Sequence, residues 1–361
     1  MRQMIYRLAV ATCLTAALAL CASTAGLTTG KAQLKSAGAL AFGPDGILFV
    51  GDSLGASVVA IDTKDNKAVK TAAKIDIKGI NEKVASLLGT MPDQILINDV
   101  KTNPISKNVY LSVSRGKGPD AIPVIVKIDA TGKLSQLSLD NVDFSSVALP
   151  DPPAENATAR RNPRLDTITD MAYVNGSVIV AGLSNEEFSS DLRSIPFPFR
   201  NEAKGASVEM YHGSHGRYET QSPVRTFVPY TIQNTQYVLA AYTCTPLVKI
   251  PVSELKAGAK VKGTTIAELG AGNQPLDMVP YRKDNHDYIL MANSSRGVMK
   301  LSVDNLEKYP SITMPTEPAG VPYTTLSELK GVKHLTKLDD SNALMLTVNG
   351  DAMNLETLPL P

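Results

Sequence analysis

Acidic residues and one histidine recur at a fixed place in the sequence, a few residues ahead of a predicted turn. They are Asp99, which follows Asn98, and then Asp170, Asp277 and His334. Carboxylates brought together by folding repel each other and lose hydration, so such a cluster needs a cation or a raised pKa on one member. We predict that these five residues hold one divalent metal ion. Oxygen ligands alone favour calcium, whereas His334 favours a transition metal.

Each of these positions opens a strand–turn–strand unit. The clearest unit runs from Ile168 to Gly182, where Asn175-Gly176 separates two runs rich in hydrophobic residues. Asn-Gly is a strong hairpin signal because both residues tolerate the positive φ of a primed turn. Similar units occur in residues 40–62, 97–139, 226–250, 276–303 and 334–358.

Repetition of one antiparallel unit along the whole chain predicts an all-β fold, a six-bladed β-propeller of four-stranded antiparallel blades. The last repeat ends about one strand short, so we expect an N-terminal strand near residues 31–35 to close the last blade. Residues 26–361 would then form a single β-propeller domain.

The first strand of a propeller blade lines the central tunnel, so the five predicted ligands would meet at one mouth of that tunnel. A second interpretation needs no metal. The aspartates could instead bond backbone N–H groups of the inner strands, in a tunnel mouth filled with water. The sequence leaves both interpretations open.

The loops between the second and third strands lie on the same face and carry further polar residues. The candidate ligand-binding residues are Asp52, Arg115, Asn185, Tyr242, Cys244, Asn293 and Arg296. A guanidinium group binds a carboxylate through two hydrogen bonds, so the arginines favour a small anionic ligand. Alternatively, the arginines pair with Glu186 or Glu187.

Cys244 has several open roles. It could be a nucleophile, a soft metal ligand, a partner of Tyr242 in a crosslink, or a small buried residue. His212 and His215 lie three residues apart in a predicted hairpin turn on the opposite face. Two histidines alone form half a metal site at most.

Two insertions interrupt the repeats, at residues 144–166 and 188–205. Long irregular loops in compact domains often cover a binding site. We expect residues 188–205, between the second and third strands of their unit, to act as a lid.

The N-terminus has the pattern of an export signal. Arg2 and Arg7 precede an apolar run over residues 8–20, and small residues follow at 23–25. Residues 1–25 are predicted to be removed, with no transmembrane segment left after cleavage. A leucine before Cys21 fits a lipid-attachment site poorly, so the protein is expected to be periplasmic or secreted, without a lipid anchor.

Composition narrows the partners. The formal net charge is +1 at pH 7, with no basic stripe or interleaved aromatic residues, so no nucleic acid partner is expected. Cys244 is the single cysteine left after removal of residues 1–25, which excludes an internal disulfide. We expect a monomer whose partner is a small molecule or another protein.

The stretch Gly38-Ala-Leu-Ala-Phe-Gly-Pro-Asp-Gly46, followed by Phe49-Val-Gly-Asp-Ser53, resembles repeats of the gluconolactonase, regucalcin and paraoxonase superfamily and of NHL-type propellers. This resemblance implies a central divalent metal, usually calcium, held by a first-blade Glu and by later Asn and Asp residues. It further implies that the metal polarises a lactone carbonyl and positions water. The later ligands match Asn98, Asp99, Asp170 and Asp277 in kind, whereas Ala39-Leu40 stands where the family has its Glu.

Two functions from different classes therefore remain. In the first, the central face lined by Asp and Arg binds a small anionic ligand or a protein partner. In the alternative, an axial metal acts as the Lewis acid of a lactonase or esterase.

Overall fold

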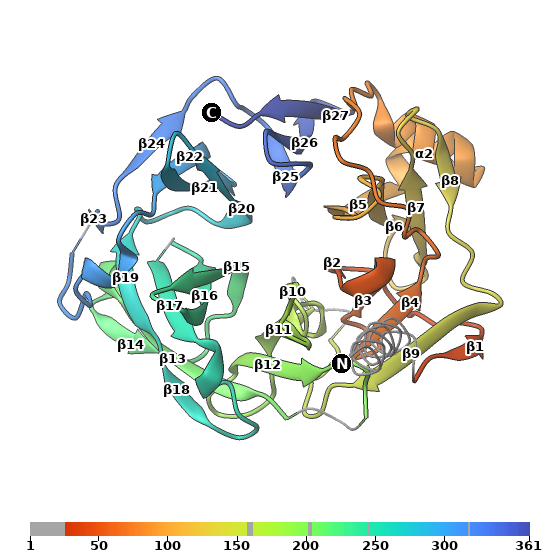
Figure 1. Ribbon diagram of the computed structural model, residues 1–361. Helices are drawn as coiled ribbons and strands as arrows, with labels where there is room; N and C mark the ends of the chain where they lie inside the picture. The colour runs from red at the N-terminus through yellow and green to blue at the C-terminus, as the bar shows by residue number, and fades with distance from the viewer. Residues whose placement is uncertain (1–25, 157–161, 201–203, 245, 317) are drawn as a thin grey trace, which may run out of the picture.

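The architecture is a ring of six antiparallel sheets (Figure 1), which confirms the predicted all-β, six-bladed propeller. It is seen in a computed structural model that describes residues 26–156, 162–200, 204–244, 246–316 and 318–361. The predicted export signal and Cys21 lie outside the described residues. Each sheet is one blade, and we name each blade after its innermost strand.

Successive strands of a blade run antiparallel from the axis outwards. The inner strands are β2 (Leu40–Phe42), β5 (Ile95–Thr102), β10 (Asp170–Val174), β15 (Val224–Ile232), β20 (Pro275–Lys283) and β25 (Val332–Lys337). The second strands are β3 (Ile47–Asp52), β6 (Val109–Arg115), β11 (Ser177–Leu183), β16 (Thr235–Tyr242), β21 (His286–Asn293) and β26 (Asn342–Asn349). The third strands are β4 (Ser57–Asp62), β7 (Ile122–Ile128), β12 (Ser190–Pro196), β17 (Pro246–Pro251), β22 (Gly297–Ser302) and β27 (Ala352–Pro359).

Outer strands complete most blades. They are β9 (Val142–Ala148), β8 (Leu134–Gln136), β13 (Ala206–His212), β19 (Thr264–Glu268) and β24 (Tyr323–Leu326). Edge additions are β1 (Thr28–Gly30), β14 (Arg217–Glu219), β18 (Lys260–Lys262) and β23 (Ala319–Gly320). The helical elements are α2 (Ile80–Leu88), η1 (Pro44–Gly46), η2 (Pro92–Gln94), η3 (Pro163–Asp166), η4 (Gly213–His215), η5 (Val252–Glu254) and η6 (Leu306–Lys308).

Tight turns join the first two strands of the blades, as the sequence predicts. Asn175 and Gly176 have φ of 46° and 87°, and the Gln233-Asn234 turn of the β15 blade has φ of 47° and 64°. Two successive residues with positive φ form the primed turn whose twist matches that of the strands. The Asn-Gly signal therefore correctly marked the inner hairpin of the β10 blade.

The blades do not follow one another around the ring in chain order. The β5 blade lies between the β2 blade and the β25 blade, while β10 lies on the other side of β2 (Figure 1). After β4 the chain leaves the β2 blade, builds the whole β5 blade, and returns as β9 to pair with β4. The β5 blade is thus an excursion within the first sheet.

This order changes how the last blade is closed. Ile77, between β4 and α2, exchanges two backbone hydrogen bonds with Leu355 of β27, at 2.7 and 2.9 Å. The segment predicted to close this blade, residues 31–35, instead lies at the first blade, where Lys35 N donates to Oδ2 of Asp52 at 2.7 Å. That choice of segment was wrong because the β4–β5 connection passes the open edge of the last blade.

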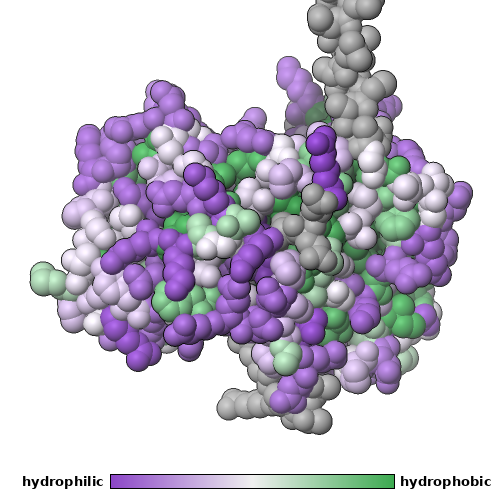
Figure 2. Space-filling view, turned by 90° about the horizontal axis from the view of Figure 1, so that it is seen from below, coloured by the Kyte–Doolittle hydropathy of each residue, from purple (hydrophilic) through white to green (hydrophobic). Residues whose placement is uncertain are grey.

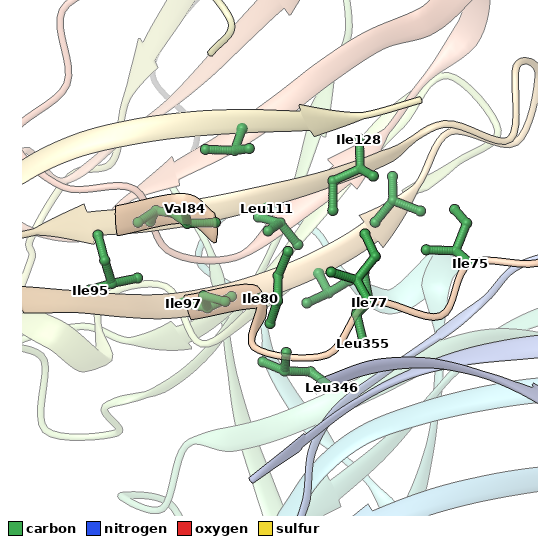
Figure 3. Close-up of a cluster of buried hydrophobic side chains, with 14 of the residues drawn as sticks. Ile75, Ile77, Ile80, Val84, Ile95, Ile97, Leu111, Ile128, Leu346 and Leu355 are labelled. Atoms are coloured by element: carbon green, nitrogen blue, oxygen red, sulfur yellow. The ribbon is translucent and has the colours of Figure 1, made fainter. Parts of the chain in front are cut away.

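The hydrophobic core consists of six clusters, one at each interface between neighbouring blades. Figure 3 shows the cluster that joins the last blade to the β5 blade. Ile77 and Ile80 pack there with Leu355 of β27 and Ile97 of β5. A core at every interface means that the ring is closed by side-chain packing as well as by backbone pairing.

The β10 blade differs from the prediction. Residues 190–196, which we expected inside a lid loop, form its third strand β12, and β13 is its fourth strand. Ser190, Asp191 and Arg193 of β12 are all buried. Because its buried positions carry polar residues, this strand has the composition of a loop, and the sequence pattern therefore did not reveal it.

Hydrophilic side chains cover most of the side wall seen in Figure 2, with hydrophobic residues in small separate groups. The large hydrophobic residues that are exposed, such as Met91 and Met314, are scattered over the surface. Among the residues that the structure describes, no helix is both long and apolar enough to cross a bilayer.

Candidate functional site

Charged side chains from four inner strands meet on the axis at one mouth of the ring. Asp99 lies in the middle of β5, and Asp170, Asp277 and His334 lie near the starts of β10, β20 and β25. The structure thus brings together the aspartates and the histidine that the sequence placed there. With Lys101 of β5, they form what we call the axial cluster.

Lys101 is the cation of this cluster, and the sequence analysis missed it. Its Nζ lies 3.3 Å from Oδ1 of Asp99 and 3.3 Å from Oδ1 of Asp277. Residues two apart on a strand face the same side, so Lys101 projects to the axis beside Asp99. That spacing was the signal in the sequence. A lysine, placed among the carboxylates, supplies the positive charge for which we had predicted a metal.

Each axial aspartate also accepts a backbone hydrogen bond from the inner strand of a neighbouring blade. Asp99 accepts from Leu40 N at 2.7 Å, Asp170 from Phe227 N at 2.9 Å, and Asp277 from Leu335 N at 3.0 Å. Three blade interfaces are therefore joined in the same way. This favours the second interpretation of the sequence, in which the aspartates bond inner-strand amides.

Burial and charge shift the pKa values of the cluster in different directions. Burial raises the pKa of Asp170 to about 6, against the opposing effect of Lys101. Burial also raises the pKa of Asp99. For Asp277 the effect of burial is outweighed by Lys101 and His334, which hold its pKa below the usual value. Burial disfavours the charged form of His334, but its bond to Asp277, at 3.2 Å, raises its pKa overall.

The Asp170→Asn substitution tests this charge balance. The new side chain does not titrate, but its amide oxygen can still accept from Thr226 Oγ1 and Phe227 N. The folded wild type binds the Asp170 proton more tightly than the unfolded chain does. Its stability relative to the variant should therefore fall by about 2–3 kcal/mol as pH rises from about 4 to about 6, and stay level above about pH 7.

The measurement is chemical denaturation of both proteins at several pH values. Asp129→Asn, at an exposed turn, is the control. The Thr131 hydroxyl lowers the pKa of Asp129, so its effect should be small and of opposite sign. A difference between wild type and Asp170→Asn that did not change between pH 4 and 7 would contradict the raised pKa.

Four inner strands begin with a β-bulge. The register of the first two strands shifts by one residue, so that Asn98, Arg225, Leu276 and Lys333 each have no partner across the hairpin. A bulge turns a side chain out of the alternation of the strand and is common beside functional sites. Here it directs an extra residue to the mouth directly before the axial positions.

A cavity of about 840 Å³ lies at this mouth, and three of the bulge residues, Asn98, Arg225 and Leu276, line it. Asn98, Thr169 and Leu276 each immediately precede one of the axial aspartates. The cavity therefore adjoins the axial aspartates along these strands, although its lining does not include the axial cluster itself. Its volume is within the range of small-molecule sites, about 300–1,000 Å³.

The insertion before β10 contributes one wall of this mouth cavity. Residues 144–148 belong to β9, but Glu155, Asn162 and residues 165–166 line the cavity. The lid was predicted in the other insertion, residues 188–205, where the structure has β12 instead. The choice of insertion was therefore wrong.

The other predicted ligand-binding residues lie outside the lining of the mouth cavity. Asp52 is buried and accepts from Lys35 N and Ser36 N, which fixes the chain at the rim. Asn293 is buried and accepts from Asn273. Tyr242 is fully buried in the core between the β10 and β15 blades, which removes its side chain from the face.

The two predicted arginines do not form the rim. Arg115 ends β6, and Arg296 donates to Ala271 O at 3.0 Å, but neither lines the cavity. Asn185 is exposed outside the cavity, and its neighbour Glu186 pairs with Lys204 instead of either arginine. Arg225 is the arginine that lines the mouth. Its place one residue before the aligned position, like that of Asn98, could have identified it.

No protein-family model matches the chain, and no curated protein matches it. Solved structures share the propeller architecture only remotely. A glucose dehydrogenase from Thermus thermophilus is 11% identical, with 92% of this chain and 100% of that chain covered and a TM-score of 0.38. The soluble aldose sugar dehydrogenase of Escherichia coli is 13% identical, with coverage of 92% and 100% and a TM-score of 0.36.

A chain from the mitotic checkpoint complex is similar to the same degree, at 10% identity, coverage of 92% and 93%, and a TM-score of 0.37. Proteins with unrelated roles thus resemble this chain equally. At such identities and TM-scores the comparisons carry no argument about its activity.

Proposed function

We propose that this protein is an exported binding propeller that takes a small organic anion into the mouth cavity. The observation that carries the proposal is the cavity itself, which adjoins the axial cluster and is lined by bulge residues of three inner strands. A concave site with a few convergent polar groups is the usual form of a small-molecule site.

The lining supports an organic ligand. Ile95, Leu165, Ile168 and Leu276 supply apolar surface, and Gln274 is among the amide side chains that can fix orientation. An apolar wall would contribute little to the binding of a bare inorganic ion, because the affinity of such an ion comes from charge and hydrogen bonds. A mixed lining instead suits a carbon skeleton with polar substituents.

The cations around the cavity support a negative charge on the ligand. Lys35 and Lys117 are exposed at the rim and have no ion pair within the described part of the chain. Arg225 lines the cavity too, with its Nη1 2.8 Å from Oδ1 of Asp166. A carboxylate entering the mouth would therefore meet two lysines at the rim, whereas the Arg225 guanidinium already pairs with Asp166.

Charge reversal at the rim tests the proposal. Thermal shift followed by calorimetry would measure binding of acetate, succinate, citrate, gluconate and inorganic phosphate to the wild type and to a Lys35→Glu/Lys117→Glu variant. At least one organic anion should bind the wild type, and the variant should bind it at least about tenfold more weakly. Replacing attraction by repulsion at two rim positions gives this expected loss.

Lys133→Glu/Lys260→Glu is the matched control, because it makes the same charge change at exposed positions outside the cavity lining. Its affinity should equal that of the wild type. An equal loss of affinity in both variants would show that the net charge of the protein, and not the two rim lysines, causes the effect, and this would contradict the proposal. Failure of the wild type to bind any anion in the panel would also contradict it.

A metal-dependent hydrolase is the second candidate. It is favoured by the approach of ligand atoms from Asp99, Asp277 and His334 to within 4.8 Å of one another. The Lys101 ammonium, 3.3 Å from both carboxylates, would have to withdraw before an ion could bind there. Because no such step is needed for a ligand in the cavity, binding is the better-supported function.

Export and the monomeric state belong to the same proposal. They rest on the N-terminal pattern of Arg2, Arg7 and residues 8–20, and on a side wall where hydrophobic residues are scattered. A ligand site that opens at one face of a closed ring needs no second copy of the chain to complete it.

A further inference from the structure

A second group of metal-ligating side chains lies between the β10 and β15 blades. One ligand atom from each of His212, His215 and Cys244 lies within 4.8 Å of the other two. The histidines come from the end of β13 and from η4, and the cysteine from the turn between β16 and β17. We call these three residues the His–Cys cluster. None of them lines the mouth cavity.

The β13–β14 hairpin places both imidazoles together. β13 ends at His212, and η4 leads to Gly216, whose φ of 64° turns the chain back into β14. The two rings lie 3.8 Å apart between centroids. The sequence analysis assigned this turn to the opposite face because it took β13 as a third strand. β13 is the fourth strand, so its end lies at the same face as the β16–β17 turn.

Glu219 of β14 orients both rings. Its carboxylate lies 3.0 Å from Nδ1 of His212 and 2.7 Å from Nδ1 of His215. Burial alone would raise the pKa of Glu219, but hydrogen bonds from the two histidines and Ser222 lower it to about 2. A carboxylate on Nδ1 is the usual second partner of a metal-ligating histidine, which then binds the metal through Nε2.

The backbone of Cys244 is held in place by a hydrogen bond. Its φ is 63°, and its backbone N donates to Asn273 O at 2.6 Å. Asn273 is itself buried and donates to Asn293. The thiol is therefore presented on an anchored turn, partly exposed to solvent. Access to solvent lets an ion reach the site.

We propose that His212, His215 and Cys244 bind one divalent late transition-metal ion, zinc in the first place. Two imidazoles and a thiolate are typical zinc ligands, and bonds of about 2.0–2.3 Å in tetrahedral geometry place the ligand atoms about 3.3–3.7 Å apart. Small side-chain rotations complete the site. Since the ligands come from two blades, the ion would link them and stabilise the folded chain.

Cobalt(II) alone serves as the spectroscopic probe for this site, and zinc(II) for stoichiometry and stability. The reduced wild-type protein should bind about one equivalent of either ion. It should show a thiolate-to-cobalt charge-transfer band in the near ultraviolet, and zinc should raise its Tm. Cys244→Ser should abolish the band, and His215→Asn should weaken cobalt binding at least about tenfold, because each removes one of the three ligands.

Two further histidine variants make the test specific. His286→Asn is the matched control, because His286 also bonds a carboxylate through Nδ1, that of Asp304 at 2.7 Å, but belongs to no such cluster in the described chain. It should leave the band and the affinity unchanged. His334→Asn removes a ligand of the axial cluster and should likewise have no effect.

The apo variants must keep the Tm of the apo wild type, which separates lost binding from lost folding. His215 is 44% exposed and Cys244 is partly exposed, so neither substitution opens the core. Binding lost in His334→Asn but kept in Cys244→Ser would overturn the proposal in favour of the axial cluster. No metal binding by the reduced wild type would also overturn it.

Discussion

Lys101→Met is expected to lower the free energy of unfolding by about 3–5 kcal/mol at pH 7–8, because it leaves buried carboxylates without their cation. Asp99 and Asp277 have side chains 8% and 7% exposed, and both lie 3.3 Å from Nζ of Lys101. Methionine keeps most of the length of the lysine side chain and removes only its charge. Urea denaturation monitored by circular dichroism gives the difference.

Two further variants show whether charge is the cause. Adding Asp277→Asn to Lys101→Met removes one orphaned carboxylate and should recover part of the loss. Lys337→Met is the control, since its pair with Asp340 is 43% and 97% exposed and should contribute less than about 1 kcal/mol. If Lys101→Met were as mild as Lys337→Met, Lys101 would not neutralise the axial cluster.

Arg193→Met should be similarly destabilising, by about 3–5 kcal/mol, because it strands the Asp191 carboxylate within the β10 blade. The two side chains are 1% and 6% exposed and form a 2.6 Å ion pair. Burial raises the pKa of Asp191 to about 6, although Arg193 opposes this effect. Without the guanidinium the carboxylate can become neutral by binding a proton, so the loss should be greater at pH 8 than at pH 5.

Denaturation curves of Arg193→Met at these two pH values give the measurement. Lys262→Met is the control, because its pair with Glu209 is 61% and 32% exposed at a distance of 3.7 Å. The double variant Asp191→Asn/Arg193→Met removes both charges and should be more stable than Arg193→Met alone. A loss that was the same at pH 5 and pH 8 would contradict an unpaired Asp191 charge as its cause.

The ring and most of the axial cluster could be predicted from the sequence. The repeated hairpins identified the ring, because short turns between alternating strands are local signals that each blade repeats. Alignment of the hairpins also placed Asp99, Asp170, Asp277 and His334 on the axis. Lys101 was within reach of the same argument, as it lies two residues beyond Asp99 on the same strand.

Other features depend on tertiary structure and left no local signal. β12 contains two buried charged residues, Asp191 and Arg193, which form an ion pair. Charged residues give this strand the composition of a loop, and the ion pair that allows their burial leaves no local signal in the sequence. The place of the β5 blade in the ring, and the pairing of Ile77 with Leu355, follow from packing between distant segments. The approach of Cys244 to the two histidines likewise requires the fourth-strand position of β13.

The mouth cavity could be predicted only in part. Asn98 was assigned to this face, and the loop after Arg115 does line the cavity, but the Arg115 and Arg296 side chains lie outside the lining. The bulges bring Arg225 and Leu276 to the mouth instead. The extra residue of a bulge lies outside the alternation of its strand, so counting back from a turn misses it.

Hydrogen–deuterium exchange with and without the tightest-binding anion of the panel tests the central claim most directly. If the anion binds in the mouth cavity, protection should appear in residues 35–39, 95–98, 114–123 and 165–169, which line it. The β13–β14 hairpin, outside that lining, should exchange as before. Protection confined to the hairpin or to the side wall, with the mouth segments unchanged, would contradict the proposed binding site.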